Sequence, residues 1–187
     1  GSYEDQQEMF GDLIMLLAMI IILVYIVMAS QFESFMSPFV IMFSIPFAFV
    51  GVLLGLWITG TPLGTMGMIG ILILMGIVVK NGIVLIDYTI LMRERGKSVA
   101  EASVIAAKSR LRPILMTTLT TVLGMIPMAI GQGEGAEMWR SLGMVVAWGL
   151  SISTLVTLVI IPTVYASMAS WQERRAARKA AKKLAKA

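Results

Sequence analysis

One lysine ends the longest uncharged part of this sequence. No Asp, Glu, Lys or Arg occurs from Ser34 to Val79, and the run stops at Lys80, within the stretch GILILMGIVVKNGIVLIDY. A charge at the centre of a hydrocarbon layer costs about 2.5–3.5 kcal/mol on insertion scales, and such residues mark ion and proton pathways. Lys80 is therefore the first candidate for chemistry, as a group that gains and loses a proton.

Few residues near Lys80 could share in proton transfer. Asn81 follows it directly, whereas Asp87 lies seven residues on, about 10 Å further along a helix, which is too far for a direct ion pair. Threonines occur at comparable depth on a later apolar stretch: Thr117, Thr118, Thr120 and Thr121. Because a threonine in a membrane helix commonly bonds the carbonyl four residues earlier, each alone is weak support. The alternative for Lys80 is a structural role, with its side chain extended to the membrane surface or paired.

Cysteine and histidine are both absent from the chain. Their absence removes disulfides, thiolate and imidazole metal sites, histidine proton relays and nucleophiles that a histidine activates. Ser151 and Ser153 therefore lack the base of a serine hydrolase, and no motif supports an intramembrane serine–lysine pair. We expect no enzymatic activity, no catalytic residue, no metal site of these ligands and no cofactor.

The composition is that of a membrane protein. Of the 187 residues, 58% are hydrophobic, and the mean hydropathy of +0.87 lies well above the range of soluble domains. A spanning helix needs roughly 20 mostly apolar residues, and long continuous apolar runs do not fit the alternating strands of a membrane barrel. We predict an all-α membrane protein with one five-helix bundle over residues 10–170. The predicted spans are about 10–30, 38–59, 66–91, 113–131 and 141–169.

Flanking charges predict the orientation, because loops rich in Lys and Arg stay in the cytoplasm. Residues 93–112 contain six Lys or Arg and two Glu, and the tail 171–187 contains seven Lys or Arg and one Glu. Residues 1–9 are acidic, open with a Gly1–Ser2 pair typical of cloning, and lack the basic start of a signal peptide. We expect the N-terminus outside and the C-terminus in the cytoplasm.

The second predicted span contains features that affect helix packing. Gly51 and Gly55 have the GxxxG spacing that allows close helix approach, although glycine is common in membrane helices. Pro38 suits a first helical turn, where its missing N–H is not needed. Pro46 lies in the predicted interior of the same helix.

Two segments are expected outside the hydrocarbon layer. Residues 98–110 are predicted to form a short amphipathic helix on the cytoplasmic surface, with Ser98 and Glu101 at capping-box spacing. Arg110 and Arg112 would meet anionic headgroups there. The basic tail is of low complexity, and we expect a solvated helix or a disordered anchor.

Three stretches resemble a known transporter family. They read MASQFESFMSPFVIMFSIPFAFVGVLLGLWITGTPLGTMGMIGILILMGIVVKNGIVLIDY, RERGKSVAEA and RLRPILMTTLTTVLGMIPMAIGQGEGAE. Together they resemble the C-terminal transmembrane repeat of the resistance-nodulation-division (RND) multidrug efflux transporters, from about Tyr3 to about Ser170. The resemblance implies an RND or sterol-sensing-domain-like repeat in the bacterial inner membrane, with helices similar to the eighth to twelfth of twelve.

The resemblance also implies roles for individual residues. In that family a lysine of the tenth helix pairs with two aspartates of the fourth, and a threonine of the eleventh completes a proton relay that drives export. Lys80 matches the lysine and Thr117 the threonine, with Asn81 beside the lysine. Arg110 lies in the cytoplasmic approach. Asp87 and Thr118 are accessory candidates at the same relay.

The chain departs from the family pattern in two respects. It contains no counterpart of the two aspartates, and none of the periplasmic porter and docking domains. One interpretation is therefore a half-transporter that gives the lysine and threonine side of the relay to a missing N-terminal half and does not transport alone. Another is a structural or engineered bundle that folds and self-associates without transport. A homodimer would not complete the relay, since it would bring two lysines together without an acid.

A third interpretation rests on methionine, of which the chain has 16. Met15 with Met19, and Met125 with Met128, have helical spacing, and thioether pairs can carry Cu(I) or Ag(I). Flexible packing in apolar helices is the stronger explanation. The expected partners are the lipid bilayer and the missing half or a second copy, and no nucleic acid.

Overall fold

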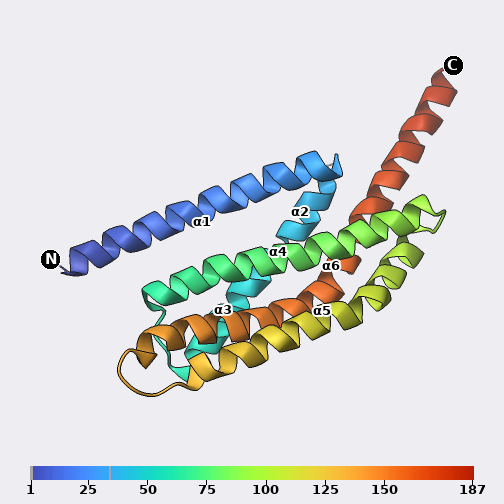
Figure 1. Cartoon of the computed structure of the whole chain (residues 1–187). Helices are drawn as coiled ribbons and strands as arrows, with labels where there is room; N and C mark the ends of the chain where they lie inside the picture. Colours follow the sequence, from blue (N-terminus) through green and yellow to red (C-terminus); the bar gives the residue numbers. More distant parts are fainter. Residues whose placement is uncertain (1, 34) are drawn as a thin grey trace.

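Within residues 2–33 and 35–187, which the computed structural model describes, the chain folds into six helices and no strand (Figure 1). The helices are α1 (Ser2–Phe32), α2 (Met36–Met42), α3 (Ser44–Thr59), α4 (Gly64–Glu94), α5 (Val99–Ile130) and α6 (Ala136–Lys186). Five segments are long and apolar enough to cross a membrane, with α2 and α3 together forming one of them. The predicted all-α, five-span architecture is confirmed. Gly1, part of the pair assigned to cloning, lies outside the described residues.

The core of the bundle forms around α4 and α6. Helix α6 packs on α3, α4 and α5, and α4 also contacts α1 and α2. In Figure 1, α4, α5 and α6 run side by side, with α3 behind α4. Several side chains in this core are fully buried: Val52, Leu74, Val78, Leu85, Val145 and Leu150.

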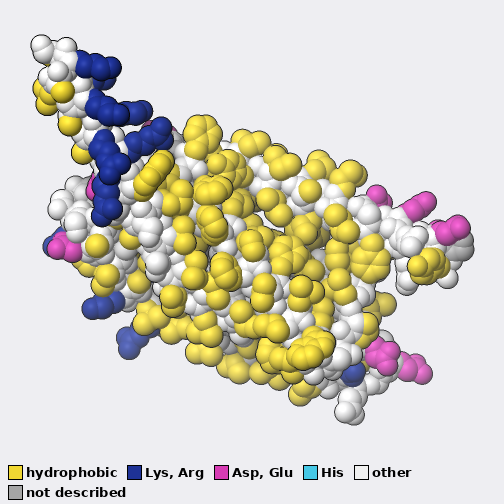
Figure 2. Space-filling view, turned by 180° about the vertical axis from the view of Figure 1, so that it is seen from behind, with side chains coloured by type: hydrophobic (Ala, Val, Ile, Leu, Met, Phe, Trp, Pro, Cys, Tyr) yellow, Lys and Arg dark blue, Asp and Glu magenta, His cyan; other side chains and the backbone are white. Residues whose placement is uncertain are grey.

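Helix α1 lies at the edge of the bundle, although it is very apolar. Only 6% of its most apolar window is buried, against 56% for α4, and its contacts are with α2 and α4. Yellow hydrophobic side chains cover much of the face of the molecule in Figure 2. Because soluble proteins rarely expose such large apolar surfaces, this surface must be covered by lipid or by other protein.

The second span is not the continuous helix 38–59 expected from its sequence, because it breaks at Phe43. Pro46 lacks the N–H that would bond the carbonyl of Met42, and its ring crowds that carbonyl. The buried Ser44 hydroxyl instead donates to the carbonyl of Ile41 at 2.6 Å. The span therefore consists of α2 and α3, which meet at this break.

Helix α5 combines two segments that were predicted to be separate helices. The predicted surface helix 98–110 and the predicted span 113–131 form one helix, which runs through Pro113 without interruption. The Ser98 side chain caps it by accepting from the Glu101 N–H at 3.3 Å, as the capping-box spacing predicts. The expected separate helix is absent because its apolar face is buried against the bundle: Val99, Ala102, Ser103 and Ala106.

Glycines allow α3 to approach α6 closely. A Cβ atom at Gly51 would lie 2.9 Å from the Cβ of Ile152, and one at Gly55 would overlap the side chain of Trp148. Both glycines are buried. The GxxxG face of α3 is therefore in contact with α6, and larger residues there would force the two helices apart.

Candidate functional site

Lys80 lies near the middle of the third membrane span. It is 16 residues from the start of the 31-residue helix α4, or roughly 24 Å along the axis, and roughly 21 Å from the other end. Its side chain is exposed on the outside of the bundle. No hydrogen bond or ion pair links Lys80 to another described residue. The chain thus places an unpaired amine on an apolar surface at the depth where a charge is least stable.

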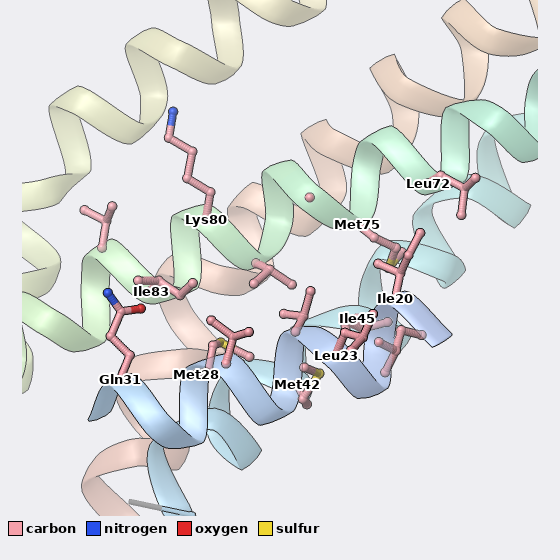
Figure 3. Close-up of a pocket in the computed structure, with 16 residues that line it drawn as sticks. Ile20, Leu23, Met28, Gln31, Met42, Ile45, Leu72, Met75, Lys80 and Ile83 are labelled. Atoms are coloured by element: carbon pink, nitrogen blue, oxygen red, sulfur yellow. The ribbon is translucent and has the colours of Figure 1, made fainter. Parts of the chain in front are cut away.

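An apolar cavity borders the backbone side of Lys80. It has a volume of about 450 Å³ and lies between α1, the α2–α3 break and α4. Figure 3 shows residues such as Met28, Ile45 and Met75 around it, whereas the Lys80 amine extends away from α1. Gln31 is the other polar side chain that lines this cavity. The cavity therefore offers Lys80 no acidic partner.

The two other candidates on α4 point in different directions. Asn81 is buried in the bundle at 6% exposure, with no hydrogen bond to a described residue. Asp87 is exposed and forms no ion pair within residues 2–33 and 35–187. The structure therefore joins neither Asn81 nor Asp87 to Lys80.

The two threonine candidates on α5 have different partners. The exposed Thr117 hydroxyl donates to the Pro113 carbonyl of its own helix at 3.1 Å. The buried Thr118 hydroxyl lies 2.9 Å from the Thr154 hydroxyl of α6, which forms an interhelical hydrogen bond. Although α4 and α5 are in contact, the described residues include no bond between either threonine and Lys80.

The Thr118–Thr154 bond predicts a measurable contribution to stability. Thr118→Val keeps the shape of the side chain but leaves the Thr154 hydroxyl unpaired, and should lower the free energy of unfolding by about 0.6–1.7 kcal/mol. Denaturation in mixed micelles measures it. Thr120→Val is the matched control, since the exposed Thr120 hydroxyl bonds only the Met116 carbonyl of its own helix. Equal effects of the two substitutions would contradict the assignment.

Arg110 is held by an aromatic ring rather than by a carboxylate. Its guanidinium carbon lies 4.9 Å from the centre of the Tyr88 ring on α4. Its Nε atom is buried and lacks a hydrogen-bond partner among the described residues. This cation–π contact joins the N-terminal half of α5 to α4 at Tyr88, the residue after Asp87.

A second group at the same end was not predicted from the sequence. Arg93 of α4 donates from Nη1 to the Tyr165 hydroxyl at 2.9 Å and from Nη2 to Glu173 Oε1 at 3.2 Å. Tyr165 is 1% exposed. Since 72 and 80 residues separate Arg93 from these partners, no local pattern could have indicated the contacts.

Comparisons with known proteins cover almost the whole chain. The model of the AcrB/AcrD/AcrF family matches residues 1–169. The swarming motility protein SwrC of Bacillus subtilis (strain 168) is 40% identical over 176 residues, which make up 94% of this chain and 17% of SwrC. The multidrug resistance protein MdtC of Proteus mirabilis (strain HI4320) is 38% identical over 180 residues, which make up 94% of this chain and 18% of MdtC.

Solved structures agree with these matches. A crystal structure of a heavy metal efflux pump resembles this chain with a TM-score of 0.81 and 32% identity, over 91% of this chain and 17% of the pump. A second crystal form of a heavy metal efflux pump gives a TM-score of 0.79 and 33% identity. The chain therefore spans about a sixth of the length of the relatives it matches.

Proposed function

Because the chain belongs to the AcrB/AcrD/AcrF family of RND transporters, we propose that it forms the Lys80 side of a proton relay whose acidic side lies on another part of the transporter. The proposal extends to Thr117 and Asn81 as relay residues and to Asp87, Arg110 and Thr118 as accessory residues. In this function the chain does not transport alone. It acts as a membrane module of a proton-driven exporter in the bacterial inner membrane.

The observation that carries the proposal is the unpaired amine of Lys80. Charged residues inside membranes almost always face a bundle interior or a water-filled cavity and pair with another polar group. Lys80 instead lies exposed at mid-span, with no partner in the described residues. The arrangement is explained if a neighbouring helix with a carboxylate covers this surface in the complete transporter.

A lysine–carboxylate contact at this depth can couple protons to movement. When the carboxylate is ionised it attracts the ammonium group strongly, because water does not screen the pair. A proton that neutralises the carboxylate removes this attraction and frees Lys80 to move. Proton binding then stabilises one conformation over another, as coupling requires. The exposed Thr117 hydroxyl, on the adjoining helix, can accept or donate a hydrogen bond in one of these states.

The orientation proposed for this function places the C-terminus in the cytoplasm. Dark blue Lys and Arg side chains gather mainly at one end of the molecule and magenta Asp and Glu mainly at the other in Figure 2. This distribution supports the positive-inside prediction.

Export of a soft metal ion is the second candidate, since the solved relatives include heavy metal efflux pumps. Met15 and Met19 are about half exposed on α1, and α1 contacts α2 and α4 rather than α5. The two predicted methionine pairs therefore do not form one site among the described residues. Each pair would have to bind a Cu(I) or Ag(I) ion with its own two thioethers.

Complementation tests the half-transporter directly. This chain is expressed with a family member that lacks its last five spans, and export of an organic dye and of Ag(I) is measured in the same cells. We expect the two chains to co-purify and export to recover. Recovery of dye export without Ag(I) export would remove the metal candidate. Lys97, in the exposed loop after α4, is the matched control for Lys80. A chain with Lys97→Met should restore export as well as the unchanged chain does. Failure to associate, or association without export of either cargo, would support the structural bundle instead.

A further inference from the structure

The last turns of α6 carry a strongly basic face. Seven Lys or Arg occur between Arg174 and Lys186, and all of these side chains are exposed. At about 100° per residue, they fall within roughly half of the helix circumference, and Leu184 and most of the alanines occupy the other half. This segment lies beyond residue 169, where the family match ends. The basic face therefore needs an explanation of its own.

The start of this segment is fixed to the end of the bundle. Glu173, the single acidic residue of the tail, accepts from Arg93 of α4 at 3.2 Å. The Arg175 guanidinium carbon lies 5.3 Å from the centre of the Trp171 ring. Since tryptophan prefers the membrane–water interface, the basic face begins where headgroups are. The one negative charge of the tail, on Glu173, is already paired with Arg93.

The direction of the segment is shown in Figure 1, where the red end of α6 leaves the bundle at an angle to α4. Figure 2 shows Lys and Arg gathered along this projecting part. Thirteen residues from Arg174 to Lys186 span roughly 20 Å. Because electrostatic attraction fades over about 8 Å at physiological salt, a helix pointing straight out would lose most of its attraction to the membrane.

We propose that the basic face of residues 174–186 binds the headgroups of anionic phospholipids and holds the end of α6 along the membrane surface. Charge complementarity identifies the partner, since a cluster of four to eight Lys or Arg directly beside a membrane span matches an anionic leaflet. The preceding span keeps the segment close to that surface, which raises its effective concentration there. A nucleic acid would fit the charge but not the interfacial start at Trp171. The inference does not depend on the proton relay.

The test uses the whole chain in vesicles, with a fluorescent label on Leu184→Cys. This is the sole thiol, because the chain has no cysteine. Energy transfer to a labelled lipid headgroup is compared between pure phosphatidylcholine vesicles and vesicles with 30% phosphatidylglycerol. We expect strong transfer in the anionic vesicles, reversed by 0.5 M salt, and weak transfer in the neutral ones. Each Lys or Arg near an anionic surface strengthens binding about fivefold. Replacing Arg174, Arg178, Lys182 and Lys186 by Gln should therefore lower the equilibrium constant for surface binding by roughly several hundred-fold.

A matched control replaces Ala176 and Ala180 by Gln, on the opposite side of the same helix, and should leave the transfer unchanged. Circular dichroism of each variant checks that the helix persists. Equal transfer in the two kinds of vesicle, or no effect of the four Gln substitutions, would overturn the proposal. If the tail binds a short RNA duplex more tightly than it binds the anionic vesicles, the proposal is overturned as well, in favour of a nucleic-acid partner.

Discussion

Replacing Lys80 by methionine is expected to abolish proton-driven export by the complete transporter while making this chain easier to insert into a membrane. The loss follows because the relay would lack its cation. The gain follows because an unpaired amine at mid-span costs about 2.5–3.5 kcal/mol on insertion scales. Export is measured with a dye in cells, and insertion of the Gly64–Glu94 segment with a translocon assay. This opposition between stability and activity is typical of functional residues.

Lys80→Arg separates a titrating group from a mere ion-pair partner. Arginine keeps the positive charge but does not release its proton in proteins. If Lys80 itself loses a proton during the cycle, Lys80→Arg should be as inactive as Lys80→Met. Full export by Lys80→Arg would show that charge alone suffices, and full export by Lys80→Met would exclude Lys80 from the relay.

Gly143→Ala and Gly124→Ala are expected to change the stability of the bundle in opposite directions. A Cβ atom at Gly143 of α6 would lie 2.8 Å from the backbone nitrogen of Ala129 and 3.1 Å from the carbonyl oxygen of Met125, both on α5. Backbone atoms cannot rotate away, so α5 and α6 must separate. Overpacking of this kind costs about 1–3 kcal/mol.

Gly124 provides the opposite case on the neighbouring helix. A Cβ atom there meets nothing within 4 Å, so alanine removes only the conformational freedom of glycine and should stabilise the helix by about 0.5–1 kcal/mol. Unfolding in mixed micelles gives both values. The same sign for both substitutions would mean that α5 and α6 do not approach as closely as the structure shows.

The helices were largely predictable, because a run of roughly 20 apolar residues in a membrane has few alternatives to a helix. Their interruptions were not. Pro46 was noted in the interior of the second span, but the sequence did not indicate that the helix breaks at Phe43. At that break the Ser44 hydroxyl donates to the Ile41 carbonyl. Residues 98–110 and 113–131 were predicted as separate helices, yet α5 runs through Pro113. Ala102 and Ala106 of its first turns are fully buried in the bundle.

Helix contacts were predicted only where they follow a local motif. The spacing of Gly51 and Gly55 indicated a close approach, and both glycines lie against α6. Gly143 and Gly149 of α6 are in equally close contact with α5 and with α3 and α4. Their spacing of six residues matches no helix–helix motif, so no local pattern distinguishes them from the other glycines.

The candidate site shows a similar limit. Lys80 could be recognised because a single charge contrasts with its apolar surroundings, whereas the interhelical partner of Thr118 could not, because Thr154 lies 36 residues away. The contact of Arg110 with Tyr88 depends on how α5 folds back on α4. That Thr117 and Asn81 act with Lys80 remains a prediction, since the Thr117 hydroxyl bonds the Pro113 carbonyl and Asn81 has no hydrogen bond to a described residue.

Carbodiimide cross-linking in the complete, membrane-embedded transporter tests the central claim most directly. This reagent joins an amine to a carboxylate in direct contact, and mass spectrometry identifies the linked peptides. We predict a bond between Lys80 and an acidic residue in the middle of a span outside this chain, lost in Lys80→Met. An unlinked Lys80 that instead reacts with water-soluble, amine-directed reagents at the membrane surface would contradict the claim that Lys80 is one half of a buried relay.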